Sequence, residues 1–167
     1  GVIRFRMGFM GEDVKKKYIE KMGAPLGELF HALWHEVVLL HVKWIEFVEL
    51  YESKLSRIEL MNRAAPLFFR LIEEVLIDDI ILHLTRLTDP PQSCGKDNLT
   101  IRLLPKHIED KKVSNEVQDL IKRVDESIEF CRDWRNRRIA HRDLLLALKK
   151  GSEPLKAVER EKLDAAL

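Results

Sequence analysis

Residues 27–51, GELFHALWHEVVLLHVKWIEFVELY, decide the fold class of this chain. Apolar side chains recur there at steps of three and four residues, which is typical of one face of an α-helix. Further apolar residues widen that face, so we expect the helix to be buried on more than one side. The first set is Phe30, Leu33, Trp34, Val37, Leu40, Trp44, Phe47, Val48 and Tyr51, and the second is Val38, Leu39, Val42 and Ile45.

Two further helices have clear ends in the first half of the chain. A short polar helix over residues 12–22 is stopped by Gly23. After a break near Ser53 or Ser56, Pro66 suits the first turn of a helix that runs to Leu87. The following Asp-Pro-Pro ends that helix, because the proline ring disfavours helical backbone at the residue before it.

The second half of the chain is also helical in pattern. Residues 92–104 form the main connection, and Ser114 or Asn115 is expected to cap a helix from residue 116 to at least Arg135. Residues 151–154 open a last amphipathic helix. Because no segment shows sustained two-residue alternation, the sequence predicts an all-α, up-and-down bundle of four to five main helices.

Length and composition predict one folded domain. The chain has 167 residues, of which 46% are apolar, and 29 basic residues against 28 acidic ones give a net charge of +1. The high apolar fraction excludes a disordered chain. The near-neutral net charge argues against a general polyanion binder, so a nucleic-acid role would need a local basic patch. We expect the domain to span residues 12–167 and residues 1–11 to be an artificial or disordered start, with Met7 or Met10 as the native beginning.

The cysteines and the apolar runs predict the compartment. Cys94 and Cys131 are the two cysteines, too few for a disulfide scaffold or a zinc-finger framework, and they are expected to be free thiols. No apolar run approaches the ~20 residues that cross a bilayer. We therefore expect a cytoplasmic protein without a membrane partner.

Several polar residues are given structural interpretations. His31 and His35 lie one helical turn apart beside Glu36, but apolar neighbours favour packed histidines, so neither a metal nor a cofactor is expected. His83 and His107 have no recognisable partner. The remaining residues of this kind are Trp34, Trp44 and Trp134, expected as core anchors, Asp78 and Asp79, expected as a solvated stripe with one ion pair, and Arg86 and Asp89, expected to close a helix end.

The segment FCRDWRNRRIAHRD, residues 130–143, carries the chemistry. From residue 132 to residue 143 it holds five arginines and two acids, a local surplus of three positive charges. A helical register through Val117, Ile121, Val124, Ile128 and Cys131 places Arg135 at the centre of the buried stripe. A guanidinium there needs a partner or another surface. Three outcomes stay open, namely a helix break near Asn136, an ion pair with an acid of a neighbouring helix such as Asp78 or Asp79, or a cleft or subunit seam that binds an anion.

His141 points to a particular reaction on that anion. Histidine both accepts and donates protons near neutral pH, and RNA supplies its own nucleophile, the 2′-hydroxyl. Arginine matches phosphate oxygens and stays charged, so one Arg and one His from each of two chains could complete a site without a metal.

Three segments resemble one protein family. The motif R-N-x-x-x-x-H, from Arg135 and Asn136 to His141, resembles the signature of the HEPN superfamily of helical domains. RLTDP at residues 86–90, NLTIRLL at 98–104 and RNRRIAHRDL at 135–144 together look like its abortive-infection AbiU-like branch. The resemblance covers the chain from Leu26 to its C-terminus.

The resemblance implies a four- to five-helix HEPN-like bundle that forms a homodimer with the two motifs facing each other. Many members are metal-independent endoribonucleases that act as toxins, paired with an antitoxin, or as phage-defence effectors, and they leave a 2′,3′-cyclic phosphate. On this basis Arg135 would hold the phosphate, Asn136 would orient the site and His141 would be the general acid and base. RNA would be held by Arg132, Arg138 and Arg142.

Two departures from that family are relevant. Some toxin members carry a tyrosine two residues after the histidine that a nucleotidyltransferase modifies, whereas this chain has Asp143 there, so that control is not expected. Other members keep the fold without nuclease activity. The rival hypothesis is therefore a non-catalytic helical module that binds a nucleotide or a partner protein in the same cleft.

Overall fold

The structure is a computed structural model, and it describes residues 11–52, 54–140, 143–148, 154–155, 158 and 160–167. The expectation for the start of the chain falls on residues 1–10, which lie outside the described residues, and so does the expected opening of the last helix at residues 151–153. The described part confirms the all-α prediction, because its only strands are two residues long each. The elements in order are α1 (Glu12–Met22), α2 (Ala24–Tyr51), α3 (Leu55–Ala64), α4 (Pro66–Leu87), β1 (Gln92–Ser93), β2 (Lys96–Asp97), the 3₁₀ turn η1 (Ile101–Leu103), α5 (Leu104–His107), α6 (Lys111–Ser127), α7 (Glu129–Trp134), the π-helical turn η2 (Arg135–Ile139), α8 (Leu144–Ala147) and α9 (Arg160–Ala166).

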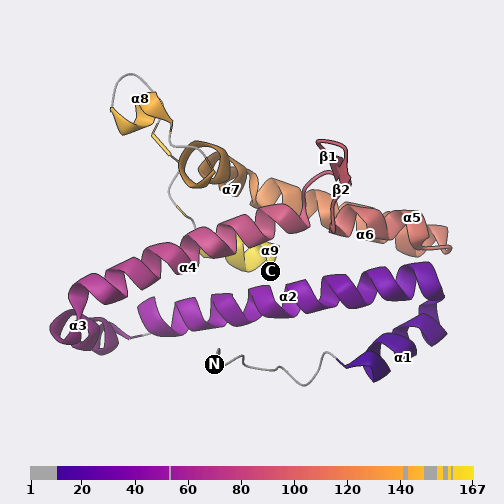
Figure 1. The fold of residues 1–167 in the computed structure, drawn as a ribbon, viewed down its shortest axis with the longest axis horizontal. Coiled ribbons are helices and arrows are strands. Elements are labelled where there is room, and N and C mark those ends of the chain that lie inside the picture. The colour runs from indigo at the N-terminus through magenta and orange to yellow at the C-terminus, as the bar shows by residue number, and fades with distance from the viewer. Residues whose placement is uncertain (1–10, 53, 141–142, 149–153, 156–157, 159) are drawn as a thin grey trace.

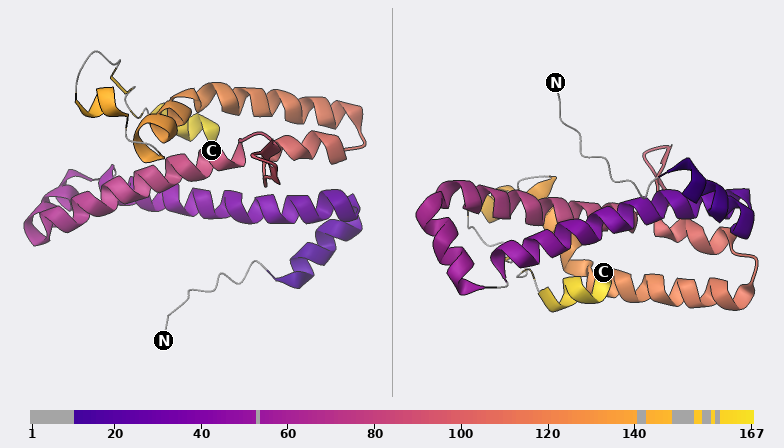
Figure 2. Two further views of the ribbon diagram at one scale, coloured as in Figure 1. Left: turned by 45° about the horizontal axis from the view of Figure 1, so that its top comes forward. Right: turned by 90° about the horizontal axis from the view of Figure 1, so that it is seen from below.

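The long helices form an up-and-down bundle. Helices α2 and α4 lie side by side and antiparallel, and α6 runs back toward α4, which α7 and η2 contact (Figures 1 and 2). Helix α1 folds back on the start of α2 around Gly23, whose φ of +79° is a conformation that glycine adopts readily. A Cβ at Gly27 would lie 2.6 Å from Ile19 Cα, so the absence of a side chain there lets the two helices approach.

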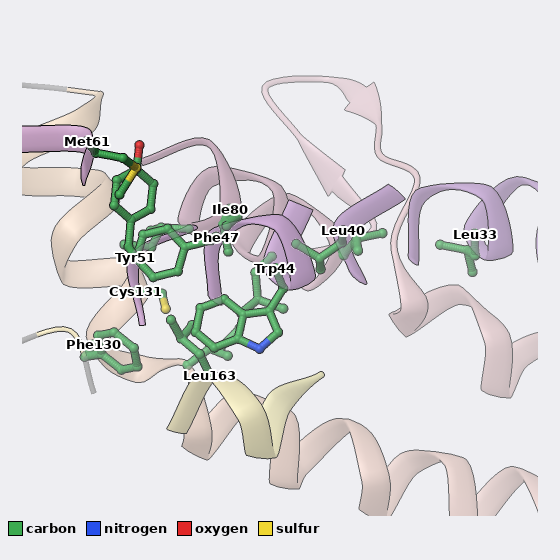
Figure 3. Close-up of a cluster of buried hydrophobic side chains, with 14 residues drawn as sticks. Leu33, Leu40, Trp44, Phe47, Tyr51, Met61, Ile80, Phe130, Cys131 and Leu163 are labelled. Carbon is green, nitrogen blue, oxygen red and sulfur yellow. The ribbon is translucent and has the colours of Figure 1, made fainter. Parts of the chain in front are cut away.

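The core lies where α2, α4, α7 and α9 meet (Figure 3). Ile128 and Cys131 are fully buried, as the helical register predicts. Helix α9 closes the core, because Leu163 is fully buried and Trp44 Nε1 donates to Asp164 Oδ1 at 2.7 Å. The buried apolar residues of this core cluster are Leu33, Leu40, Trp44, Phe47, Tyr51, Met61, Ile80, Ile81, Leu84, Leu87, Ile128, Phe130, Cys131 and Leu163.

Trp34 is not the core anchor that its spacing predicts. It is 46% exposed and stacks on Phe30, with ring centroids 6.2 Å apart. Phe30 in turn meets Tyr18 of α1 edge to face, at 5.0 Å. The aromatic side chains therefore pack against one another at the α1–α2 corner, and one face of Trp34 stays open.

The predicted single helix from residue 116 to at least Arg135 is wrong at its start and in its continuity. Helix α6 begins at Lys111, because the carboxylate of Asp110 accepts the backbone N–H groups of Lys112 and Val113. The Ser114 hydroxyl instead donates to the carbonyl of Pro105 at 3.1 Å. The helix is interrupted at Ile128, whose φ of −102° and ψ of 10° separate α6 from α7.

The connection at residues 92–104 has more structure than expected. Gln92 pairs with Asp97 and Ser93 with Lys96 in a small antiparallel hairpin, and His107 belongs to α5. The hairpin lies beside the end of α4 (Figure 1). Of the helices described, none has the length and apolar character needed to cross a membrane.

Candidate functional site

The C-terminal end of α4 is surrounded by arginine side chains. The Thr88 carbonyl accepts from Arg102 Nε at 2.8 Å and from Arg132 Nη2 at 3.0 Å, and the Thr88 hydroxyl accepts from Arg132 at 2.9 Å. The buried hydroxyl of Thr100 donates to the Leu87 carbonyl at 2.9 Å. Carbonyls at a helix C-terminus lack helical partners and carry partial negative charge, so cationic donors stabilise this end.

Two aspartates complete this network. Asp125 of α6 binds Arg102 at 2.5 Å and Arg132 at 3.0 Å. Asp89, just after α4, binds Arg135 at 2.6 Å and Arg132 at 3.5 Å. We call these five side chains, Arg102, Arg132, Arg135, Asp89 and Asp125, the arginine cluster. It joins η1, α6, α7 and η2 to the end of α4, and its three cations against two acids leave one positive charge.

Arg135 is the first residue of the π-helical turn. Its carbonyl accepts from the N–H of Ala140, five residues on, at 2.7 Å. A turn with one extra residue redirects the side chains that follow, and such turns are frequent at functional sites. Arg135 pairs with Asp89, so the alternative of an ion pair with an acid is the one found, although neither Asp78 nor Asp79 is the partner. Asp79 binds Lys43 at 2.6 Å.

The other predicted site residues are spread around η2. Asn136 is exposed and its Oδ1 accepts from Arg135 Nε at 3.2 Å, so these two residues are brought together. The guanidinium of the exposed Arg138 lies 4.7 Å from the centre of the Trp134 ring, a cation–π contact. His141 and Arg142 lie outside the described residues.

A cleft of about 850 Å³ separates Arg138 from the acids of α4. Its lining includes Glu74, Asp78, Arg137, Arg138 and Asp143. Burial raises the pKa of Asp78, and the positive charge of Arg138 partly offsets this. The side of η2 that carries Arg138 is therefore distinct from the side on which Arg135 meets Asp89.

A second cleft, of about 400 Å³, adjoins the arginine cluster. We call it the α4-end cleft, and it is lined by Glu36, His83, Arg86, Leu87, Asp89, Asn98 and Leu99. Asp89 lines this cleft and also binds Arg135, so the cleft and the ion pair have one residue in common. Within the part of the chain that the structure describes, no group of three or more His, Cys, Asp or Glu side chains could hold a metal ion.

His83 lies at the inner side of this cleft and does have partners. The ring is 1% exposed, Lys43 Nζ donates to Nδ1 at 3.1 Å, and Nε2 lies 2.9 Å from Glu36 Oε2, although not in hydrogen-bond geometry. Burial lowers the pKa of His83 and the charge of Lys43 lowers it further, while Glu36 opposes this. Because Nδ1 faces the Lys43 ammonium as acceptor, Nε2 is the nitrogen that would carry the proton of a neutral imidazole, on the side of Glu36.

A family model decides the identity of the chain. It is described as AbiU2, a HEPN family, and it matches residues 23–167. The chain belongs to the AbiU2 family of HEPN domains. No curated protein and no solved structure matches it. The protein is thus an abortive-infection-related HEPN domain with an all-α bundle.

For this AbiU2 chain, sequence reasoning missed the acids that hold the arginines. The sequence predicts only that Asp89 closes a helix end, and its pattern assigns no site role to Asp125 or Arg102. The available signal was the pairing of RLTDP with NLTIRLL, since Asp89 of the first segment and Arg102 of the second both join the arginine cluster. Arg132, predicted to hold RNA, has both terminal nitrogens in contact with the cluster and the end of α4.

Proposed function

We propose that this AbiU2-family protein binds RNA and cuts it as a metal-independent endoribonuclease, acting as a toxin or phage-defence effector. The observation that carries the proposal is the 2.6 Å contact between Arg135 and Asp89, beside Asn136. It holds a guanidinium in a defined position at the start of the R-N-x-x-x-x-H motif. A positioned cation is what stabilisation of a phosphorane needs.

Each motif residue has a distinct task in the proposed reaction. His141 removes the proton from the 2′-hydroxyl, whose oxygen attacks the adjacent phosphorus. Arg135 stabilises the charge on the phosphorane oxygens, and Asn136 fixes the orientation of Arg135 through the Oδ1 contact. The 5′-oxygen leaves with a proton from the motif of the second chain, and a 2′,3′-cyclic phosphate remains.

The other arginines around η2 contribute positive charge that attracts the RNA backbone. Arg138 is exposed and stacks on Trp134, so it is placed to meet a backbone phosphate, and Arg142 is assigned the same role. Arg132 stays within the arginine cluster and adds to the positive potential around Arg135.

The proposed active unit is a homodimer. The first half of α4 exposes a row of apolar side chains at four-residue spacing, a pattern that marks an interaction surface. The turn η2 packs on the same helix. In this proposal a second copy covers this face and brings the two motifs together, which the composite site requires. We call the face the α4 apolar face, and its residues are Leu67, Phe68, Leu71, Ile72 and Val75.

One observation favours the rival, a non-catalytic module that binds a nucleotide or partner protein. Arg135 already has an acidic partner, Asp89, so part of its charge is neutralised before any phosphate arrives. A phosphate would have to compete with that carboxylate or share the guanidinium with it.

Cleavage of a mixed RNA pool in EDTA distinguishes the endoribonuclease from the non-catalytic binding module. Wild type is compared with His141→Ala, Arg135→Ala and the matched surface control Arg63→Ala, all verified as folded. We expect cyclic-phosphate ends from wild type and the control, and about 100-fold less from the other two. Absence of cleavage by wild type across several RNAs and pH values would favour the binding module.

A further inference from the structure

The α4-end cleft has the size and polarity of a ligand site. Its volume of about 400 Å³ lies within the range of small-molecule pockets, roughly 300–1,000 Å³. Leu87 and Leu99 supply apolar surface, and the remaining lining is charged or polar. An aromatic ring with polar edges suits such walls.

The carboxylates in the cleft keep unused acceptor atoms. Both arginine contacts of Asp89 are made through Oδ1, and no described residue binds Oδ2. Glu36 Oε2 lies beside His83 Nε2, whereas among the described residues Oε1 has only His35, at 3.7 Å, beyond hydrogen-bond distance. The cleft therefore offers acceptors for a ligand with N–H donors.

One cation in the cleft is loosely held. Arg86 is 57% exposed, and among the described residues its only ion pair is with Glu36 at 3.8 Å. A guanidinium with this freedom can turn toward an acceptor atom of a ligand.

We propose that the α4-end cleft binds a guanine base of single-stranded RNA, next to the phosphate that Arg135 holds. The inference rests on the proposed function, since RNA is the ligand of both. The sharing of Asp89 between the cleft and Arg135 places the base and the phosphate as neighbours.

Guanine fits because of the order of its donors and acceptors. Its Watson–Crick edge presents N1–H and the N2 amino group side by side, which match a carboxylate that only accepts, and O6 accepts from arginine. Uracil presents a single N–H between two carbonyls, which carboxylates repel. Adenine and cytosine each present one amino group beside a ring nitrogen that accepts, so a carboxylate meets half of that edge unfavourably.

His83 and Lys43 act as positioning residues for this edge. Lys43 holds one side of the imidazole and the other side abuts Glu36, so the carboxylate has a buried support. Glu36 is thus the residue on which the choice of base depends, and Arg86 is its partner for O6.

The test is binding of the four nucleoside 3′-monophosphates by calorimetry. We expect guanosine 3′-monophosphate to bind about tenfold more tightly than the other three. Glu36→Gln should remove that preference, since an amide presents a donor to N1–H, whereas Glu46→Gln, an exposed residue of the same helix, should keep it. Arg86→Ala should reduce the preference, and Arg63→Ala should not.

Thermal melts establish that each variant is folded, and Arg86 is exposed enough that its variant folds even if Glu36→Gln does not. Equal binding of all four nucleotides, binding of none, or a guanine preference that survives both cleft variants overturns the proposal. Cleavage is measured separately on the same proteins. Guanine-selective binding without cleavage would support the guanine site and contradict the nuclease proposal. Cleavage without base preference would support the nuclease proposal and contradict the guanine site.

Discussion

Arg135 Nη1 lies 2.6 Å from Asp89 Oδ1, across a separation of 46 residues. Arg135 comes from the π-helical turn and Asp89 from the first residues after α4. Both side chains are 24% exposed, so the pair lies at the edge of the bundle, open to solvent on one side. Asp89 thereby orients the first motif residue and also limits its free charge.

Asp89→Asn should separate these two effects. The neutral amide holds Arg135 less firmly, so we expect kcat for RNA cleavage to fall by about 10- to 100-fold. Because a negative charge is lost beside the phosphate site, KM should stay the same or decrease. Steady-state kinetics on one RNA substrate measures both.

Asp119→Asn is the matched control for that variant. Asp119 is an exposed α6 residue that pairs with Lys122 at 3.2 Å, and its change should leave kcat and KM unaltered. An Asp89→Asn protein with unchanged kcat would show that Asp89 does not position Arg135 for catalysis.

The helix ends that depend on local residues were predictable. The bounds 12–22 and 66–87 agree with α1 and α4, because a glycine, a proline and an Asp-Pro-Pro act within one turn. The start of α6 was not, since Asp110 and Ser114 are equally good caps locally. The carbonyl of Pro105, nine residues before Ser114, takes the serine hydroxyl and leaves Asp110 as the cap.

The site was also predictable only in part, because its contacts join residues that are far apart in the sequence. Register placed Arg135 among core positions and required a partner, but the partner lies 46 residues away in a turn that no periodicity describes. The turn η2 packs against α4, a tertiary contact that periodicity does not describe. Asp89 and Asp125 therefore became visible only with the fold.

Phe68→Glu should dissociate the proposed homodimer. A charge in the α4 apolar face would be desolvated at a subunit seam, which costs several kcal/mol. We expect sedimentation of wild type as a dimer and of the variant as a monomer. Leu120→Glu, which changes an exposed leucine of α6, should remain dimeric. If Phe68→Glu sediments as wild type does, the dimer uses another face.

The two cysteines should differ in reactivity. Cys94 is exposed in the hairpin, whereas burial raises the pKa of Cys131 to about 12. The thiolate is the reactive form, so a thiol reagent at neutral pH should modify one cysteine in the native protein and both after denaturation. Native Cys94→Ser should not react. Rapid labelling of Cys131 would mean that the core around α7 opens readily.

Leu163→Ala tests whether α9 belongs to the core. Leu163 is fully buried, so we expect a loss of about 2–5 kcal/mol in the free energy of unfolding, measured with urea. Leu148→Ala removes the same atoms from a residue that is 52% exposed, and should change that free energy by less than about 0.5 kcal/mol. Equal effects of the two would contradict the packing of α9 on Trp44.

His83→Gln should change how stability depends on pH. Burial, and then Lys43, lower the pKa of His83 below its usual 6.5 in the folded protein, against the opposing charges of Glu36 and Asp79. As the pH falls through about 6.5, the unfolded chain takes up a proton at this position that the folded protein does not, so the unfolded state is favoured. The contribution to stability is complete above the unfolded pKa and is lost progressively below it. Urea unfolding at about pH 7.5 and about pH 5.5 should therefore show a larger loss in wild type than in His83→Gln, whose amide does not titrate. An equal loss in both proteins would mean that His83 binds its proton as readily folded as unfolded, which would contradict its neutral state beside Lys43.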